Sequence, residues 1–231
     1  MYENYATAAP TYDLGLKRFM QSVFNNMSLG LAVTGLISYF IGTSPELLKL
    51  FFGGPQMWIV MLAPIGIVLL MSFTIDSMSV QTARVWFYVY AAAMGVSLSS
   101  IFAVFTGQSI TQVFFITATM FGATSLYGYT TKKDLTGMGN FLIMGLIGLV
   151  IAGVVNIFLQ SSVMHMVISF ITVLVFTGLT AWDVQKLKSI YYDTWGEEQE
   201  KLGIMGALNL YMDFINIFIN LLQLIGVKNN D

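Results

Sequence analysis

Two aspartates stand in apolar surroundings, where an ionised side chain is costly. Asp213 lies well inside the last long apolar stretch of the chain, and Asp183 lies near the end of the apolar stretch before it. A carboxyl group in such a place must be protonated or find a partner, and acids buried in this way usually serve a function. Asp183 and Asp213 are therefore the first candidate functional residues.

Three asparagines share the last apolar stretch with Asp213. Asn209, Asp213, Asn216 and Asn220 are spaced by 4, 3 and 4 residues, so they project from one face if the stretch is helical. The asparagines can join helices by hydrogen bonds, and they can also line a cation path. A neutral amide would join helices at lower cost than a carboxylate, which favours a functional role for Asp213.

Asp183 and Asp213 can meet if the two stretches that carry them form antiparallel helices. Two carboxyl groups in hydrogen-bond contact share one proton, because ionising both at short range is costly. Such a pair is a proton-sensitive latch: proton loss separates the helices by charge repulsion and exposes oxygens of the kind that Ca²⁺ binds. Alternatively, Asp183 is a solvated residue at a helix end. Arg84 is a candidate counter-ion to the pair.

The composition indicates that lipid surrounds most of this chain. Hydrophobic residues make up 56% of the 231 residues and charged residues 10%, with a mean hydropathy of +0.75, whereas a soluble domain carries about a quarter charged residues. The net charge of -2 argues against a nucleic-acid partner. With no Cys and one His, thiolate catalysis and Cys or His metal clusters are excluded, and we expect no cofactor.

Seven apolar stretches are long enough to cross a bilayer as helices, which takes about 20 residues each. We place them at 24–42, 57–75, 85–106, 110–130, 138–160, 164–186 and 204–226. The chain is thus predicted to be an all-α, polytopic membrane protein. Residues 1–22 would form a cytoplasmic N-terminal segment, 23–227 a seven-helix transmembrane domain and 228–231 a short outer tail. We interpret 43–56 as a loop, 107–109 as a tight turn and 187–203 as a long charged connection.

The positions of Lys and Arg predict the orientation of the bundle. Eight of the ten basic residues fall in the N-terminal segment or in the connections after the second, fourth and sixth helices, and only Lys49 and Lys228 fall on the other side. Cytoplasmic flanks carry the excess of basic residues. We therefore expect the N-terminus in the cytoplasm and the C-terminus outside.

Three longer segments carry a family resemblance. They are FGATSLYGYTTKKDL at 121–135, TAWDVQKLK at 180–188 and GALNLYMDFINIFINLL at 206–222. These segments, together with the helix spacing, resemble the bacterial branch of the transmembrane Bax-inhibitor-motif family over nearly the whole chain. The resemblance implies a bundle around a central, acid-bearing last helix, a place in the bacterial inner membrane, and a pH-sensitive calcium leak.

The resemblance also assigns roles to particular residues. The paired aspartates of the family fall on Asp183 and Asp213. Some members carry an arginine near the cytoplasmic end of the second helix that pairs with these acids. In this chain the register places Ser79 at that position, with Asp76 and Arg84 nearby.

We therefore expect a pH-sensitive Ca²⁺ leak channel without enzymatic activity. Asp183 and Asp213 would be its proton sensor and candidate Ca²⁺ ligands, the asparagines its cation path, and the bilayer, Ca²⁺ and protons its partners. The main alternative is a non-transporting regulator that acts through membrane-protein partners in stress response or quality control. Ca²⁺/H⁺ exchange is a further alternative. An intramembrane aspartyl protease is disfavoured, because Leu-Tyr-Met precedes Asp213 where such enzymes carry a glycine-flanked motif.

Overall fold

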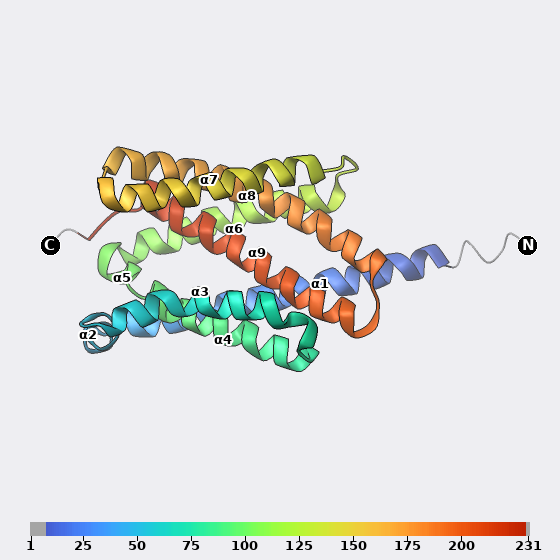
Figure 1. Ribbon diagram of the computed structural model, residues 1–231, viewed down its shortest axis with the longest axis horizontal. Coiled ribbons are helices and arrows are strands. Elements are labelled where there is room, and N and C mark those ends of the chain that lie inside the picture. Colours follow the sequence, from blue (N-terminus) through green and yellow to red (C-terminus); the bar gives the residue numbers. More distant parts are fainter. Residues whose placement is uncertain (1–7, 230–231) are drawn as a thin grey trace, which may run out of the picture.

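The computed structural model describes residues 8–229, and their backbone is almost entirely helical. The elements are α1 (Ala8–Gly42), α2 (Pro45–Phe52), α3 (Gln56–Thr74), the 3₁₀ turn η1 (Ile75–Ser77), α4 (Val80–Leu98), α5 (Ile101–Val104), α6 (Gly107–Thr130), α7 (Thr136–Leu159), α8 (Ser162–Asp193) and α9 (Gly196–Ile225). Within the described residues, seven helical segments are long and apolar enough to cross a membrane, and they run along the long axis of the molecule (Figure 1). The expectation of an all-α, polytopic membrane protein is confirmed.

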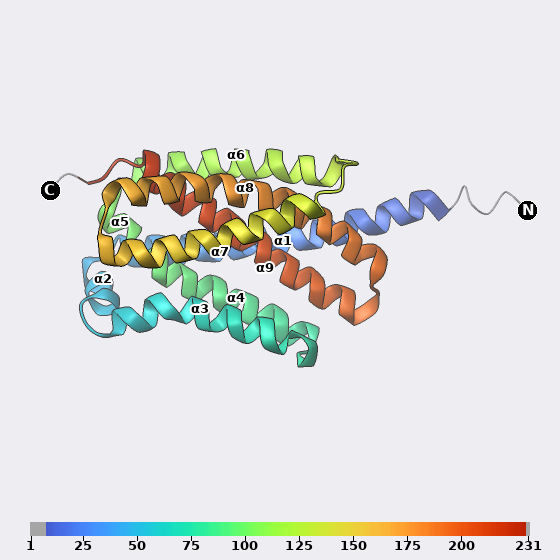
Figure 2. The same ribbon diagram turned by 45° about the horizontal axis from the view of Figure 1, so that its top comes forward.

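Helix α9 occupies the centre of the bundle. It packs against α8, α1, α6 and α4. Figures 1 and 2 show it crossing diagonally between α6, α7 and α8 on one side and α1, α3 and α4 on the other. In its apolar central part 67% of the residues are buried, whereas none are in the corresponding part of α7, which faces outward. The expected bundle around a central last helix is therefore the observed fold.

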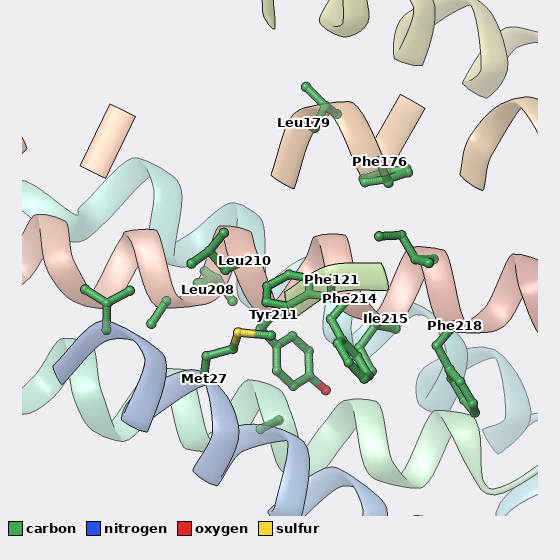
Figure 3. Packing of buried hydrophobic residues seen from close by; sticks show 14 of the residues in the cluster. Met27, Phe121, Phe176, Leu179, Leu208, Leu210, Tyr211, Phe214, Ile215 and Phe218 are labelled. Atoms are coloured by element: carbon green, nitrogen blue, oxygen red, sulfur yellow. The ribbon is translucent and has the colours of Figure 1, made fainter. Parts of the chain in front are cut away.

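Aromatic side chains join α9 to its neighbours (Figure 3). The Phe214 ring packs edge-on against Phe114 and Phe121 of α6, with ring centroids 5.5 Å and 5.6 Å away. On another face of α9, the Tyr211 ring packs against Phe87 of α4, with centroids 6.0 Å apart. Such edge-to-face pairs add to the dispersion contacts of the buried rings. Helix α9 is thus packed firmly on the sides that face α4 and α6.

A buried hydrogen-bond chain joins α9 to α1 and α4. The hydroxyl of Thr34 donates to the carbonyl oxygen of Ala91 at 2.7 Å, and it lies 2.6 Å from the hydroxyl of Tyr211. Because Thr34 has a single hydroxyl hydrogen, Tyr211 is the donor in the second bond. Three helices therefore meet at one satisfied polar group inside the bundle.

Two connections at one end of the bundle differ from the sequence expectation. The expected loop at 43–56 contains helix α2, which begins after Ser44, whose hydroxyl accepts from the backbone N–H of Leu47 at 3.4 Å. The expected turn at 107–109 is the first turn of α6, which the side chain of Thr106 caps. Both expectations were wrong because Pro and Gly also occur in the first turn of a helix or just beyond its end.

The expected charged connection at 187–203 is also wrong. Helix α8 continues to Asp193 and α9 begins at Gly196, so only Thr194 and Trp195 separate the two helices. Gly196 has a φ of 61°, which a glycine adopts without strain and which allows this sharp reversal. The charged residues of this stretch indicate that it is exposed to water. A helix that extends beyond the apolar layer exposes them to water as well as a loop does, so charge alone does not predict a loop.

One end of the bundle carries most of the positive charge. The N-terminal part of α1 and the α3–α4, α6–α7 and α8–α9 connections all lie at this end, called the basic end below (Figure 1). At the opposite end, residues 104–106 pair with the start of the expected outer tail: Asn229 N–H donates to Val104 O at 2.9 Å. Of the expected terminal segments, residues 1–7 and 230–231 lie outside the described residues. Much of the expected N-terminal segment belongs to α1.

Gly128 brings α6 and α8 into close contact. A Cβ atom at this position would overlap the carbonyl oxygen of Ala181, a backbone atom that can move only if α8 moves. Gly122, on the same helix, has open space where a Cβ would lie. The two glycines therefore form a matched pair for testing how α6 packs.

We expect Gly128→Ala to lower the stability of the protein, because overpacking costs about 1–3 kcal/mol. Gly122→Ala should leave stability unchanged or raise it, because alanine favours the helix. Thermal unfolding of the purified proteins in one detergent measures both effects. A Gly128→Ala protein as stable as the wild type would contradict the close contact between α6 and α8.

Candidate functional site

The structure brings Asp183 and Asp213 together. Asp183 projects from α8 and Asp213 from α9, and their carboxyl groups are in hydrogen-bond contact. Asp213 is only 4% exposed, and Asp183 is partly buried. Two carboxyl groups can hydrogen-bond only when one of them holds a proton. The geometry is therefore one in which two acids can share a proton.

The surroundings of Asp213 leave it short of other donors. The Thr180 hydroxyl contacts its carboxyl group, but that hydroxyl also lies 2.8 Å from the carbonyl oxygen of Phe176, so its one hydrogen serves either acceptor. Among the side chains that the structure describes, from residue 14 to 229, Oδ2 of Asp213 has no hydrogen-bond donor. A buried carboxylate in this position is unfavourable, so a proton shared with Asp183 would lower the cost of burying Asp213.

A small cavity leads to the acid pair from the basic end. Its volume is about 120 Å³, and it is lined by Asp183 and Lys186 of α8 and Asn209 of α9. This volume admits several water molecules. Lys186 is the cation that acts electrostatically on Asp183. Asp183 is thus the member of the pair that the cavity reaches, while Asp213 lies deeper in the bundle.

The asparagines of α9 differ in their surroundings. Asn209 lines the cavity beside Asp183. Asn216 and Asn220 donate their side-chain N–H groups to carbonyl oxygens one turn earlier in α9, at 2.8 Å and 2.9 Å. Among the described residues we find no hydrogen bond from these two amides to another helix. Of the three asparagines, the structure places Asn209 in the cavity beside Asp183. A cation path along all three stays a prediction.

Arg84 lies in a different cavity from the acid pair. That cavity, of about 330 Å³, lies between α1, α4 and α9 and also contains Asn26 and Glu200. The role of Arg84 as a counter-ion stays a prediction. Ser79, at the register position of the family's arginine, caps α4 by accepting from the N–H of Thr82 at 3.1 Å. The backbone carbonyl of Asp76 accepts from the Lys201 ammonium at 3.3 Å.

Two residues of the site were missed by sequence reasoning. Thr180, which contacts Asp213, and Lys186, which acts on Asp183, each lie three positions from Asp183 on the same helix. Residues at this spacing share a helix face. This three-residue spacing could have identified both residues from the sequence. It does so only if α8 is known to continue beyond Asp183.

The acid pair does not resemble a closed metal site. Within the described part of the chain, no group of three or more His, Cys, Asp or Glu residues is placed to hold a metal ion. Ca²⁺ takes about six to eight oxygen ligands, and the pair supplies two carboxyl groups. The binding of Ca²⁺ by Asp183 and Asp213 stays a prediction.

The chain was compared with known protein families and with curated proteins. Residues 16–230 match the family described as inhibitor of apoptosis-promoting Bax1. An uncharacterized protein of Rickettsia prowazekii is 46% identical over 221 residues, which cover 95% of this chain and 94% of that protein. The inner membrane protein YbhL of Escherichia coli is 42% identical over 92% of both chains. An uncharacterized membrane protein of Streptococcus pyogenes is 32% identical over 93% of this chain and 94% of its own length.

The contact between α8 and α9 at the acid pair can be tested with a disulfide, because the chain has no native Cys. We expect the double variant Asp183→Cys, Asp213→Cys to form a disulfide under mild oxidation, since side chains in direct contact lie within the short range that a disulfide bridges. Asp183→Cys with Asn220→Cys is the control, because Asn220 lies about two turns further along α9. Mass spectrometry of alkylated protein counts the remaining thiols. Equal oxidation of both pairs would contradict the observed contact.

Proposed function

The chain belongs to the family of inhibitor of apoptosis-promoting Bax1 proteins, and we propose that it is a pH-sensitive Ca²⁺ leak channel gated by Asp183 and Asp213. The observation that carries this proposal is the buried contact between the two carboxyl groups. A bacterial inner membrane is the proposed location, as in the name of the Escherichia coli relative. The basic end would then face the cytoplasm and the C-terminus the outside.

In the proposed closed state, a proton holds α8 against α9. The hydrogen bond between Asp183 and Asp213 buries both acids at the centre of the bundle. With this bond in place, the cavity beside Asp183 ends at the acid pair, and the tightly packed side chains around α9 separate it from the opposite end. An ion would have no continuous polar route across the bundle.

Loss of the shared proton would open the route. Two carboxylates at hydrogen-bond distance repel each other strongly in a medium of low polarity. Helix α9 is packed on several sides by aromatic contacts, and α8 packs against α6 and α7, so the repulsion would separate the two helices at the acid pair. The separated carboxylates and the side-chain oxygen of Asn209 would then offer the oxygen ligands that Ca²⁺ prefers.

The polar face of α9 would continue the route beyond the acid pair. Asn216 and Asn220 follow Asp213 on the same helix face, and their N–H groups bond to their own helix. Their side-chain oxygens are therefore the atoms available to a passing cation. Lys186 lines the small cavity beside Asp183. Its positive charge would repel cations from this cavity while Asp183 is paired with Asp213.

We expect Ca²⁺ flux into dye-loaded proteoliposomes to rise with pH over about pH 5 to 8, because flux requires loss of the shared proton. A gate that releases one proton changes the flux by at most about tenfold per pH unit. Asp183→Asn and Asp213→Asn should each shift this pH profile, because the acid that remains no longer shares its proton with a second carboxyl group.

Asp134→Asn is the matched control for the flux measurement. Asp134 is a fully exposed acid in the α6–α7 connection, and hydrogen bonds from the side chain and backbone of Thr136 lower its pKa. It therefore stays ionised throughout this pH range, and its replacement should leave the pH profile unchanged. A wild type without flux at any pH would contradict the channel and favour the regulatory role. Proton release coupled to each Ca²⁺ taken up would favour Ca²⁺/H⁺ exchange.

A further inference from the structure

A larger basic cavity lies at the basic end, apart from the acid pair. Its volume is about 430 Å³, and it lies between the α6–α7 connection and α8. Lys132 and Lys133 of the connection and Lys186 of α8 line it, together with one acid, Asp134. Asp134 is engaged locally, because its carboxylate accepts from the backbone N–H of Thr136 at 2.9 Å. The cavity thus carries three lysines and a single carboxylate, which already accepts a hydrogen bond. This excess of positive charge attracts anions.

The wall of this cavity is held in place by hydrogen bonds. The side-chain oxygen of Gln185 accepts from the N–H of Leu135 at 2.8 Å, and its N–H₂ group donates to the carbonyl oxygen of Lys133 at 2.8 Å. One amide of α8 thereby fixes the backbone of the connection at two adjacent points. The lysines extend from a backbone that is already ordered, which lowers the entropic cost of binding a ligand.

An aromatic ring forms another part of the lining. The ring of Trp182 packs onto α7 at Gly139, where a Cβ atom would overlap the ring. The ammonium of Lys186 lies 5.1 Å from the centroid of the same ring. Gly139 therefore allows the position of Trp182, and Trp182 helps to hold Lys186 at the edge of the cavity.

We propose that this cavity binds the phosphate group of an anionic lipid headgroup. Basic pockets between transmembrane helices bind such headgroups, and tryptophan is typical of the depth at which headgroups lie. Helix α7 begins at the cavity and presents exposed apolar side chains along its length, among them Phe141 and Met144. A lipid whose phosphate occupies the cavity can lay its acyl chains along this surface. A free phosphate is also an anion, but it has no acyl chains to pack against the apolar surface of α7.

The test compares three probes on the purified full chain in detergent. They are dihexanoylphosphatidylglycerol, the zwitterionic dihexanoylphosphatidylcholine, and inorganic phosphate, with binding read by native mass spectrometry. We expect the anionic lipid to bind, the zwitterionic lipid to bind at least about tenfold more weakly, and inorganic phosphate to compete poorly. Competition by inorganic phosphate at equal concentration would instead identify the free anion as the ligand of the same cavity.

Two triple variants locate the site. Replacing Lys132, Lys133 and Lys186 by Gln should weaken binding of the anionic lipid by at least about tenfold, because each lysine near a lipid surface contributes about fivefold. Replacing Lys17, Lys49 and Lys201 by Gln changes the net charge equally and should leave binding unchanged. Size-exclusion profiles confirm that both variants are folded. Equal effects of the two variants, or the absence of anion binding by the wild type, would overturn the proposal.

Discussion

The hydrogen bond between the carboxyl groups of Asp183 and Asp213 determines how two acids can be buried in this bundle. Asp213 is almost completely buried on the central helix, and its Oδ2 atom has no N–H or O–H donor within the described residues. A proton shared by the two groups would lower the charge of the buried pair from two negative charges to one, which would reduce the cost of burying it. In the proposed mechanism the same proton would tie α8 to α9, so that a local chemical event would change the packing of two long helices.

Both helices that carry the acid pair are packed against other helices of the bundle. Aromatic rings of α4 and α6 and the Tyr211–Thr34 hydrogen bond hold α9 from three sides. Helix α8 meets α6 at Gly128 and α9 at Gly206, where a Cβ atom would overlap the side chain of Leu187. These close approaches leave little space for small adjustments, so α8 and α9 have well-defined packed positions relative to each other.

The sequence predicted the global architecture better than the local surroundings of the site. Apolar length determines which segments cross a membrane, so the seven helices were found, and the 4, 3, 4 spacing placed Asp213 and its asparagines on one face. The continuation of α8 and α9 through 187–203 was missed because charge reports exposure to water but not backbone conformation. The neighbours of the acids, such as Lys186 at Asp183, depend on the rotation of each helix about its axis. The packing of the whole bundle determines that rotation.

Infrared spectroscopy tests the shared proton most directly. The spectrum of the wild type in lipid at neutral pH is compared with those of Asp183→Asn and Asp213→Asn. A shared proton predicts a C=O band from a protonated carboxyl group in the wild type, and a shift or loss of this band in each variant, because the remaining acid pairs with an amide. A wild type without this band, or a band that is unchanged in both variants, would contradict the proton-sharing pair.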